Sequence, residues 1–198
     1  TLYPIHRLDK ITSGLMIFAR TSQVNRELSV QLAEKKIEKY YLALSVSKPT
    51  KKQGMVSGDM EKGRRGSYLL TRQKTNPAVT RFFARSIEPL FPKDGQERKH
   101  WLFVIKPETG KTHQIRVALK SVGSGVLGDG RYSPISADRG YLHAYKVRFD
   151  LYGQRYEITD PFFLGDYINL EDDAAKSVLG EYLAPETLVW PKGAFLLS

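Results

Sequence analysis

Cysteine is absent from the 198-residue chain, and no apolar run approaches the roughly 20 residues that a membrane-spanning helix needs. Without thiols the protein has no disulfide framework, no cysteine nucleophile and no thiolate-bound zinc. A chain without cysteine suits a reducing compartment, so we expect a cytoplasmic protein. The four histidines form neither an HxxxH nor an HExxH pattern, and we therefore predict no metal site.

Acidic residues are scarce in the first half of the chain. Residues 1–100 carry 20 Lys and Arg against 9 Asp and Glu, whereas residues 101–198 carry 11 against 12. A basic half favours a polyanionic partner, nucleic acid first, although a solvated surface is the alternative reading of any single charge run. The densest basic stretches, 48–52 and 61–65, are punctuated by Gly and Pro and indicate loops. A basic amphipathic helix that binds membranes is not indicated.

Two glycine-containing segments imitate phosphate-binding loops but lack the required context. Gly123–Gly128 matches GxGxxG, yet a predicted helix precedes it and a turn signal follows. Thr109–Thr112 imitates the end of a P-loop, but no glycine stands at the upstream spacing. We interpret Gly123 as a helix C-cap followed by a tight turn. We expect no organic cofactor.

Apolar periodicity predicts an alternation of strands and helices without a regular βαβ rhythm. This pattern favours an α+β fold, a single domain over residues 1–198 whose largely antiparallel mixed sheet is flanked by helices and loops. The polar stretch 48–76 predicts hairpins and loops. The expected strands are Leu15–Ala19, Tyr40–Val46, Ala78–Glu88, Trp101–Pro107, Leu142–Asp150 and Gln154–Thr159, with a turn at Pro92–Lys99; the expected helices are 22–36, capped by Ser22, then Thr112–Val122 and Leu170–Leu183.

Three segments carry side chains whose roles stay open when each segment is read alone. Asp9 precedes an apolar run, where a carboxylate is either catalytic or turn-forming. Tyr40 and Tyr41 point to opposite faces of the expected strand, so at most one faces a site and either could be core. Arg116 lies one turn into an expected helix, where a surface arginine is equally consistent.

Taken together, these segments resemble the ordered motifs of RluA-like pseudouridine synthases. The match runs from Pro4 to Phe149, and the acidic segment 160–198 lies outside it. The matching segments are His6–Leu15 (HRLDxxTSGL), Lys39–Ala43 (KxYLA), Gly110–Val117 (GKTHQIRV), Gly128-Asp129 with Tyr132 (GDxxY) and Leu142–Ala144 (LHA).

The chain also departs from this family pattern at three places. Ala118 stands where the family usually has His, and Ser124-Gly125 replaces the usual His-Pro. The upstream strand of KPxGxxV type is absent, so we expect that an N-terminal strand region is missing from a domain that begins here at Thr1. These departures concern the shape of RNA-contacting loops more than the catalytic motifs.

The resemblance implies isomerisation of a uridine in ribosomal or transfer RNA by a monomeric enzyme that needs no cofactor. Asp9, Tyr41 and Arg116 match the family's catalytic residues. The residues expected to bind RNA are Arg7, Lys39, Arg64, Arg65, Lys111, His113 and Leu142. Two alternatives remain: a non-catalytic RNA-binding module on the same fold, and a nucleoside hydrolase, which would typically need a second carboxylate.

Overall fold

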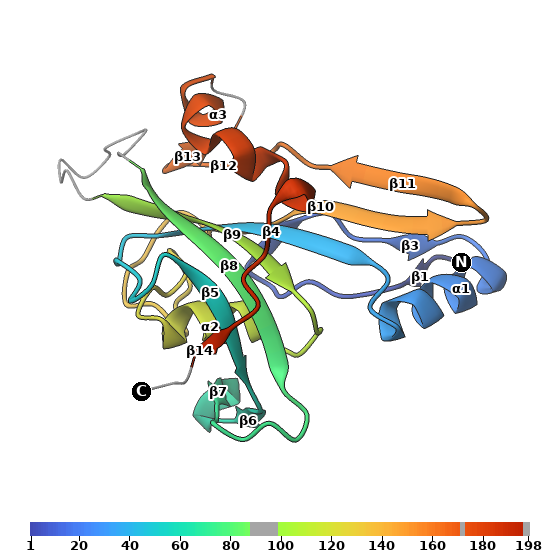
Figure 1. Ribbon diagram of the computed structural model, residues 1–198, viewed down its shortest axis with the longest axis horizontal. Coiled ribbons are helices and arrows are strands. Elements are labelled where there is room, and N and C mark those ends of the chain that lie inside the picture. The colour runs from blue at the N-terminus through green and yellow to red at the C-terminus, as the bar shows by residue number, and fades with distance from the viewer. Residues whose placement is uncertain (88–98, 171–172, 196–198) are drawn as a thin grey trace.

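The computed structural model describes residues 1–87, 99–170 and 173–195 (Figure 1). Within these ranges the main sheet has eight strands, and its pairs are antiparallel except β2 with β10 and β14 with β5. Their order is β11-β10-β4-β9-β8-β5-β14, with β2 beside β10. The strands are β2 (Thr12–Gly14), β4 (Glu38–Ser45), β5 (Gln53–Gly58), β8 (Ala78–Ile87), β9 (His100–Pro107), β10 (Leu142–Leu151), β11 (Gln154–Thr159) and β14 (Ala194–Phe195). The α+β prediction with a largely antiparallel sheet is confirmed.

Smaller elements surround this sheet. Among the described residues, two-stranded ribbons are formed by β1 (Tyr3–Pro4) with β3 (Phe18–Ala19), β6 (Met60–Lys62) with β7 (Tyr68–Leu70), and β12 (Leu164–Gly165) with β13 (Ile168–Asn169). The α-helices are α1 (Ser22–Ala33), α2 (Gln114–Ser121) and α3 (Asp173–Leu179), and single 3-10 turns occupy Arg64–Gly66, Gly180–Leu183 and Pro185–Thr187. In the described part of the chain, no helix has the length and apolar character to cross a bilayer.

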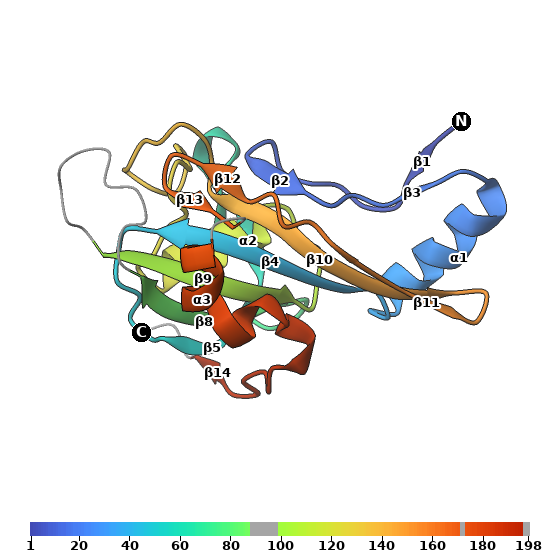
Figure 2. The same ribbon diagram turned by 90° about the horizontal axis from the view of Figure 1, so that it is seen from above.

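Strand alternation along β4 separates two cores on opposite faces of the sheet. Tyr41 and Ala43 pack on the face covered by α2, together with Leu119 of that helix. Leu42 and Leu44 point the other way, toward the C-terminal segment (the described residues of 163–190). Each fully buried leucine contributes about 1.5–3 kcal/mol of hydrophobic stabilisation, so these contacts fix which residue of the Tyr40-Tyr41 pair faces α2. Figures 1 and 2 show α2 and α3 on opposite sides of the sheet.

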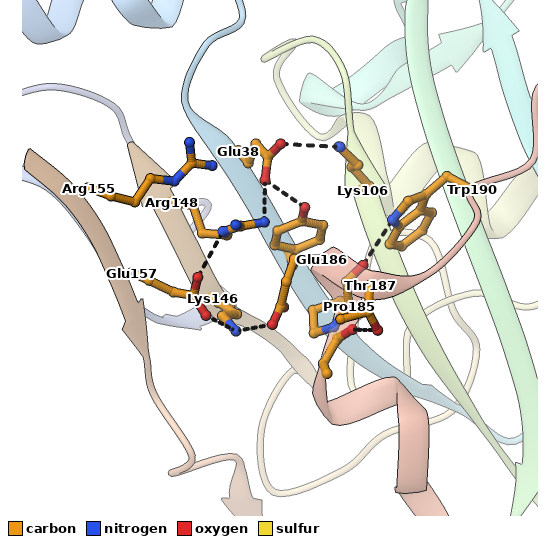
Figure 3. Close-up of polar contacts among 12 residues, drawn as sticks. Glu38, Lys106, Lys146, Arg148, Arg155, Glu157, Pro185, Glu186, Thr187 and Trp190 are labelled. Carbon is orange, nitrogen blue, oxygen red and sulfur yellow. Dashed lines mark hydrogen bonds and ion pairs between the residues drawn. The ribbon is translucent and has the colours of Figure 1, made fainter. Parts of the chain in front are cut away.

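A network of ion pairs on this face, drawn in Figure 3, joins strands β4, β10 and β11 and reaches the C-terminal segment through Glu186. The ammonium of Lys146 in β10 lies 2.6 Å from a carboxylate oxygen of Glu157 and 2.7 Å from one of Glu186. Arg148 lies 3.2 Å from Glu38 and 2.9 Å from Glu157. Because the Lys146 side chain is only 7% exposed, these partners offset the cost of burying its charge.

The prediction of a strand over Leu15–Ala19 is wrong for most of these residues. Instead of a single strand over Leu15–Ala19, the chain forms β2 before this run and the two-residue β3 at its end. The N–H of Leu15 donates to the carbonyl of Ala144 at 2.9 Å, and the chain then leaves β10 and pairs with β1. The change of partner explains why Leu15–Ala19 is not a continuous buried strand.

The helix boundaries differ from the predictions at their ends. Thr21, not Ser22, caps α1, because its hydroxyl accepts the N–H of Val24 at 3.3 Å. The expected helix at Leu170–Leu183 is an α-helix only over Asp173–Leu179 and continues as a 3-10 turn. Three parts of the predicted elements lie outside the described residues: Glu88 at the end of the expected strand Ala78–Glu88, all but Lys99 of the expected turn at 92–99, and residues 171–172.

Candidate active site

The loop that carries Asp9 is fixed against β10. The N–H of Thr12 donates to the carbonyl of Asp9 at 2.9 Å, and β2 then runs parallel to β10 with Gly14 opposite Ala144. Gly14 has φ +99°, and a Cβ there would lie 2.3 Å from the Ala144 carbonyl oxygen. Only glycine allows this close approach, so the sequence Thr-Ser-Gly specifies where the Asp9 loop lies.

His143 holds the same loop through its side chain. The Nε2 atom lies 3.0 Å from the carbonyl oxygen of Asp160, which can only accept, so Nε2 carries the proton. The Nδ1 atom then accepts the hydroxyl of Ser13 at 2.8 Å. Burial lowers the pKa of His143, which favours this neutral ring, and the ring stacks on Phe163 at a centroid distance of 5.2 Å.

Arg116 of α2 links two carboxylates. Its Nη1 lies 3.3 Å from Oδ2 of Asp9, while Nε and Nη2 bind Asp129 at 2.7 and 2.8 Å. The Asp129 side chain is 1% exposed, Arg116 6% and Asp9 17%. Burial alone would lower the pKa of Arg116, but the two carboxylates raise it above its ordinary value. The guanidinium is therefore a fixed cation whose free edge faces Asp9.

Tyr41 and Tyr40 lie on opposite faces of the sheet. Tyr41 is buried on the α2 face, where burial and then the charge of Asp9 raise its pKa to about 12. Tyr40 donates to Glu38 at 2.8 Å and stacks on Trp190 at a centroid distance of 6.0 Å, in the network on the other face. The structure thus places Tyr41, and not Tyr40, beside Asp9.

A cavity of about 90 Å³ brings most of the expected site residues together. Its lining includes Asp9, Tyr41, Arg7, Lys39, Lys111, His113 and Leu142. Arg116 joins this group through Asp9. Arg64 and Arg65 do not line the cavity and lie exposed in the turn between β6 and β7. In the described ranges, no cluster of three His, Asp or Glu side chains is arranged to hold a metal ion.

The sequence matches a family model described as RNA pseudouridylate synthase over residues 1–121. The chain belongs to this family. The match confirms the resemblance to RluA-like pseudouridine synthases that the ordered motifs predict. It includes the loop of Asp9, the strand of Tyr41 and the helix of Arg116.

Several proteins similar to this pseudouridylate synthase domain are named as pseudouridine synthases. An uncharacterized RNA pseudouridine synthase of Haemophilus influenzae is 48% identical over 157 residues, which cover 78% of this chain and 66% of that protein. The ribosomal large subunit pseudouridine synthase C of Vibrio vulnificus is 32% identical over 154 residues, covering 73% of this chain and 46% of its own. The matched part of this chain therefore spans less than two thirds of the length of these relatives.

Solved structures share the fold of this domain. Human RNA Pseudouridylate Synthase Domain Containing 1 aligns with a TM-score of 0.70 at 21% identity, covering all of this chain and 77% of that one. Human RNA Pseudouridylate Synthase Domain Containing 4 aligns with a TM-score of 0.64, also at 21% identity, over 92% and 76% of the two chains.

The synthase domain also contains site residues that its motifs do not assign. Asp129 belongs to the GDxxY motif and His143 to the LHA motif, but neither motif indicates which partner the side chain binds. The partners are Arg116, 13 residues away from Asp129, and Ser13, 130 residues away from His143. Only the fold brings these groups together.

Proposed function

We propose that this chain converts uridine in RNA to pseudouridine. The bond between C1′ and N1 breaks, the base turns over, a bond forms between C1′ and C5, N1 takes up a proton and C5 loses one. The ion pair between Asp9 and Arg116, at the cavity that Tyr41 also lines, carries this proposal. It supplies a carboxylate, an orienting cation and a phenol within one site.

Asp9 acts on the sugar in this scheme. As an ionised carboxylate it attacks C1′ or removes a proton from C2′, and both routes need the carboxylate held in one direction. Arg116 provides that orientation from 3.3 Å, and the double contact with Asp129 keeps the guanidinium from following Asp9. The role of Arg116 is therefore to position the carboxylate and balance its charge.

Tyr41 lines the same cavity as Asp9, and we assign it the removal of the proton from C5 of the uracil base. A tyrosine with a pKa of about 12 is a poor base near neutral pH. One of the two causes of the raised pKa is the charge of Asp9. A covalent bond between Asp9 and C1′ would neutralise that charge, so formation of the intermediate lowers the barrier for the later proton transfer.

Basic side chains around the cavity suit a nucleic-acid substrate. A larger cavity of about 1000 Å³ shares Arg7, Lys39 and Lys111 with the catalytic cavity. It adds Lys35 and Lys106, so that five basic side chains line it against two carboxylates, Glu38 and Glu108. Such a groove fits the sugar-phosphate backbone beside an extruded base. We assign base contacts to Arg7 and Leu142, and phosphate contacts to Lys39, Lys111, His113, Arg64 and Arg65.

The proposed substrate is structured RNA, ribosomal or transfer. One relative is named for the large ribosomal subunit, which supports ribosomal RNA as the first substrate to test. The monomeric state and the cytoplasmic location stay predictions.

The test is to incubate the protein with mixed ribosomal and transfer RNA and to map carbodiimide-adduct stops by primer extension. New stops at defined uridines support the proposal. Release of free uracil would replace isomerisation by glycosidic hydrolysis. RNA binding with neither product would leave a non-catalytic binding module.

A further inference from the structure

Tyr132 contacts Arg116 with its ring. The guanidinium carbon of Arg116 lies 4.9 Å from the centroid of the Tyr132 ring, a distance typical of a cation–π contact. The side chain comes from the turn after Asp129 and is 6% exposed. The ring thus supports one face of the guanidinium whose edges bind Asp129 and Asp9.

The hydroxyl of the same tyrosine contacts a different part of the chain. Its oxygen accepts the backbone N–H of Tyr68 at 2.7 Å and lies 2.8 Å from Nδ1 of His113. Burial and the Arg116 charge lower the pKa of His113, so the neutral ring can accept the phenol proton. A directed chain of hydrogen bonds results, from Tyr68 through Tyr132 to His113, the residue directly before the helix that carries Arg116.

Tyr68 belongs to the ribbon formed by β6 and β7, here called the basic hairpin (residues 60–70). Arg64 and Arg65 are exposed in its turn. A second contact joins the hairpin to the residue beside Tyr132, because the guanidinium of Arg131 donates to the carbonyl of Arg65. Residues 131 and 132 therefore connect the basic hairpin with the catalytic helix.

We propose that Tyr132 is a positioning residue that fixes the basic hairpin relative to Arg116. The hydroxyl sets where Arg64 and Arg65 hold the RNA, and the ring sets where Arg116 holds Asp9. This inference rests on the proposed function, because it assumes that the hairpin binds the substrate RNA. It divides one side chain into a part that governs RNA binding and a part that governs the chemical step.

The test compares Tyr132→Phe with Tyr132→Leu in steady-state isomerisation of RNA. The Phe variant keeps the ring and loses both hydroxyl contacts, of which the one to the Tyr68 N–H anchors the hairpin, so KM rises roughly three- to tenfold while kcat stays near wild type. The Leu variant also removes the cation–π contact and lowers kcat. In the Tyr132→Phe background, Arg64→Glu raises KM by a smaller factor than in the wild type, because the hairpin is already displaced.

Tyr145→Phe is the matched control. Tyr145 is 5% exposed and its hydroxyl donates to the Leu183 carbonyl at 3.0 Å, on the sheet face opposite α2. This variant loses a comparable hydrogen bond and a comparable amount of stability against urea, yet keeps the wild-type KM. Equal KM values for Tyr132→Phe and Tyr145→Phe would overturn the inference. An equal effect of Arg64→Glu on KM in the wild type and in the Tyr132→Phe variant would also overturn it.

The same variants separate this inference from the proposed function. Should the wild type bind RNA without isomerising it, the proposed function fails, and the dissociation constants of the five variants still test the coupling. Weaker RNA binding by Tyr132→Phe but not by Tyr145→Phe supports the inference in that case. Unchanged binding by both overturns it.

Discussion

Replacing Asp129 with Asn removes the charge that holds Arg116. In the wild type, two nitrogens of Arg116 bind Asp129 at 2.7 and 2.8 Å, and a third reaches Asp9 at 3.3 Å. The substituted amide keeps one carbonyl acceptor and turns an NH₂ group toward the guanidinium. Arg116 then has a single charged partner, Asp9, and shifts toward it.

The expected loss of unfolding free energy follows from the burial of the Arg116–Asp129 ion pair. Breaking one partner of a buried ion pair costs about 3–5 kcal/mol, and the remaining amide acceptor places the expected loss near the lower end, at about 3 kcal/mol. A natural domain of this size has about 5–15 kcal/mol of unfolding free energy, so the variant still folds. The kcat for isomerisation falls as well, because the displaced guanidinium no longer holds the Asp9 carboxylate in its productive direction.

The assay is equilibrium unfolding in urea together with single-turnover isomerisation, using Asp150→Asn as the control. Asp150 accepts from Arg155 at 3.2 Å, but these side chains are 59% and 49% exposed and line neither cavity, and an exposed pair of this kind is worth at most about 1 kcal/mol. If Asp129→Asn loses no more stability than Asp150→Asn and isomerises RNA at the wild-type rate, the proposed role of Asp129 is refuted.

Three further predictions concern the loop and its surroundings. Gly14→Ala places a methyl group 2.3 Å from a β10 carbonyl and abolishes isomerisation in the RNA assay, whereas Gly153→Ala, at φ +77° with no described atom within 4 Å of the added carbon, keeps it. Tyr41→Phe stalls the reaction after glycosidic cleavage and Tyr40→Phe stays active; the reverse result would show that the other tyrosine serves the site. Burial holds the pKa of His6 at about 4 in the folded protein, below its ordinary 6.5, so the unfolded chain takes up a proton first and unfolding free energy falls as the pH drops from 6.5 to 4. His6→Gln removes the contribution of His6 to this pH dependence, which urea unfolding at several pH values measures. An equal fall of unfolding free energy in variant and wild type between pH 7 and 4 would disprove the assignment.

Much of the sheet could be predicted because its strands are apolar and long. The runs over β4, β9 and β10 are buried on both faces, so burial and β propensity agree along their length. The short strands could not be predicted in the same way. β2 exists because Gly14 fits against Ala144, a partner 130 residues away, and no local pattern marks where the chain then leaves β10.

The same distinction holds for the site, where single residues could be predicted and contacts between segments could not. The family motifs identified Asp9, Tyr41 and Arg116, and the fold places them together because β4, α2 and the Asp9 loop meet on one face of the sheet. The partner of Arg116 and the function of Tyr132 could not be read from the motifs, because each depends on a contact between segments. The position of a carboxylate in a motif does not reveal which cation it binds.

The central claim is that Asp9 drives uridine isomerisation, and the most direct measurement uses RNA labelled with tritium at C5 of uridine. Isomerisation releases the label to water when C5 loses its hydrogen. The account predicts tritium release by the wild type and none by Asp9→Asn, with RNA affinity nearly unchanged in the variant. Tritium release by Asp9→Asn at the wild-type rate would contradict the account.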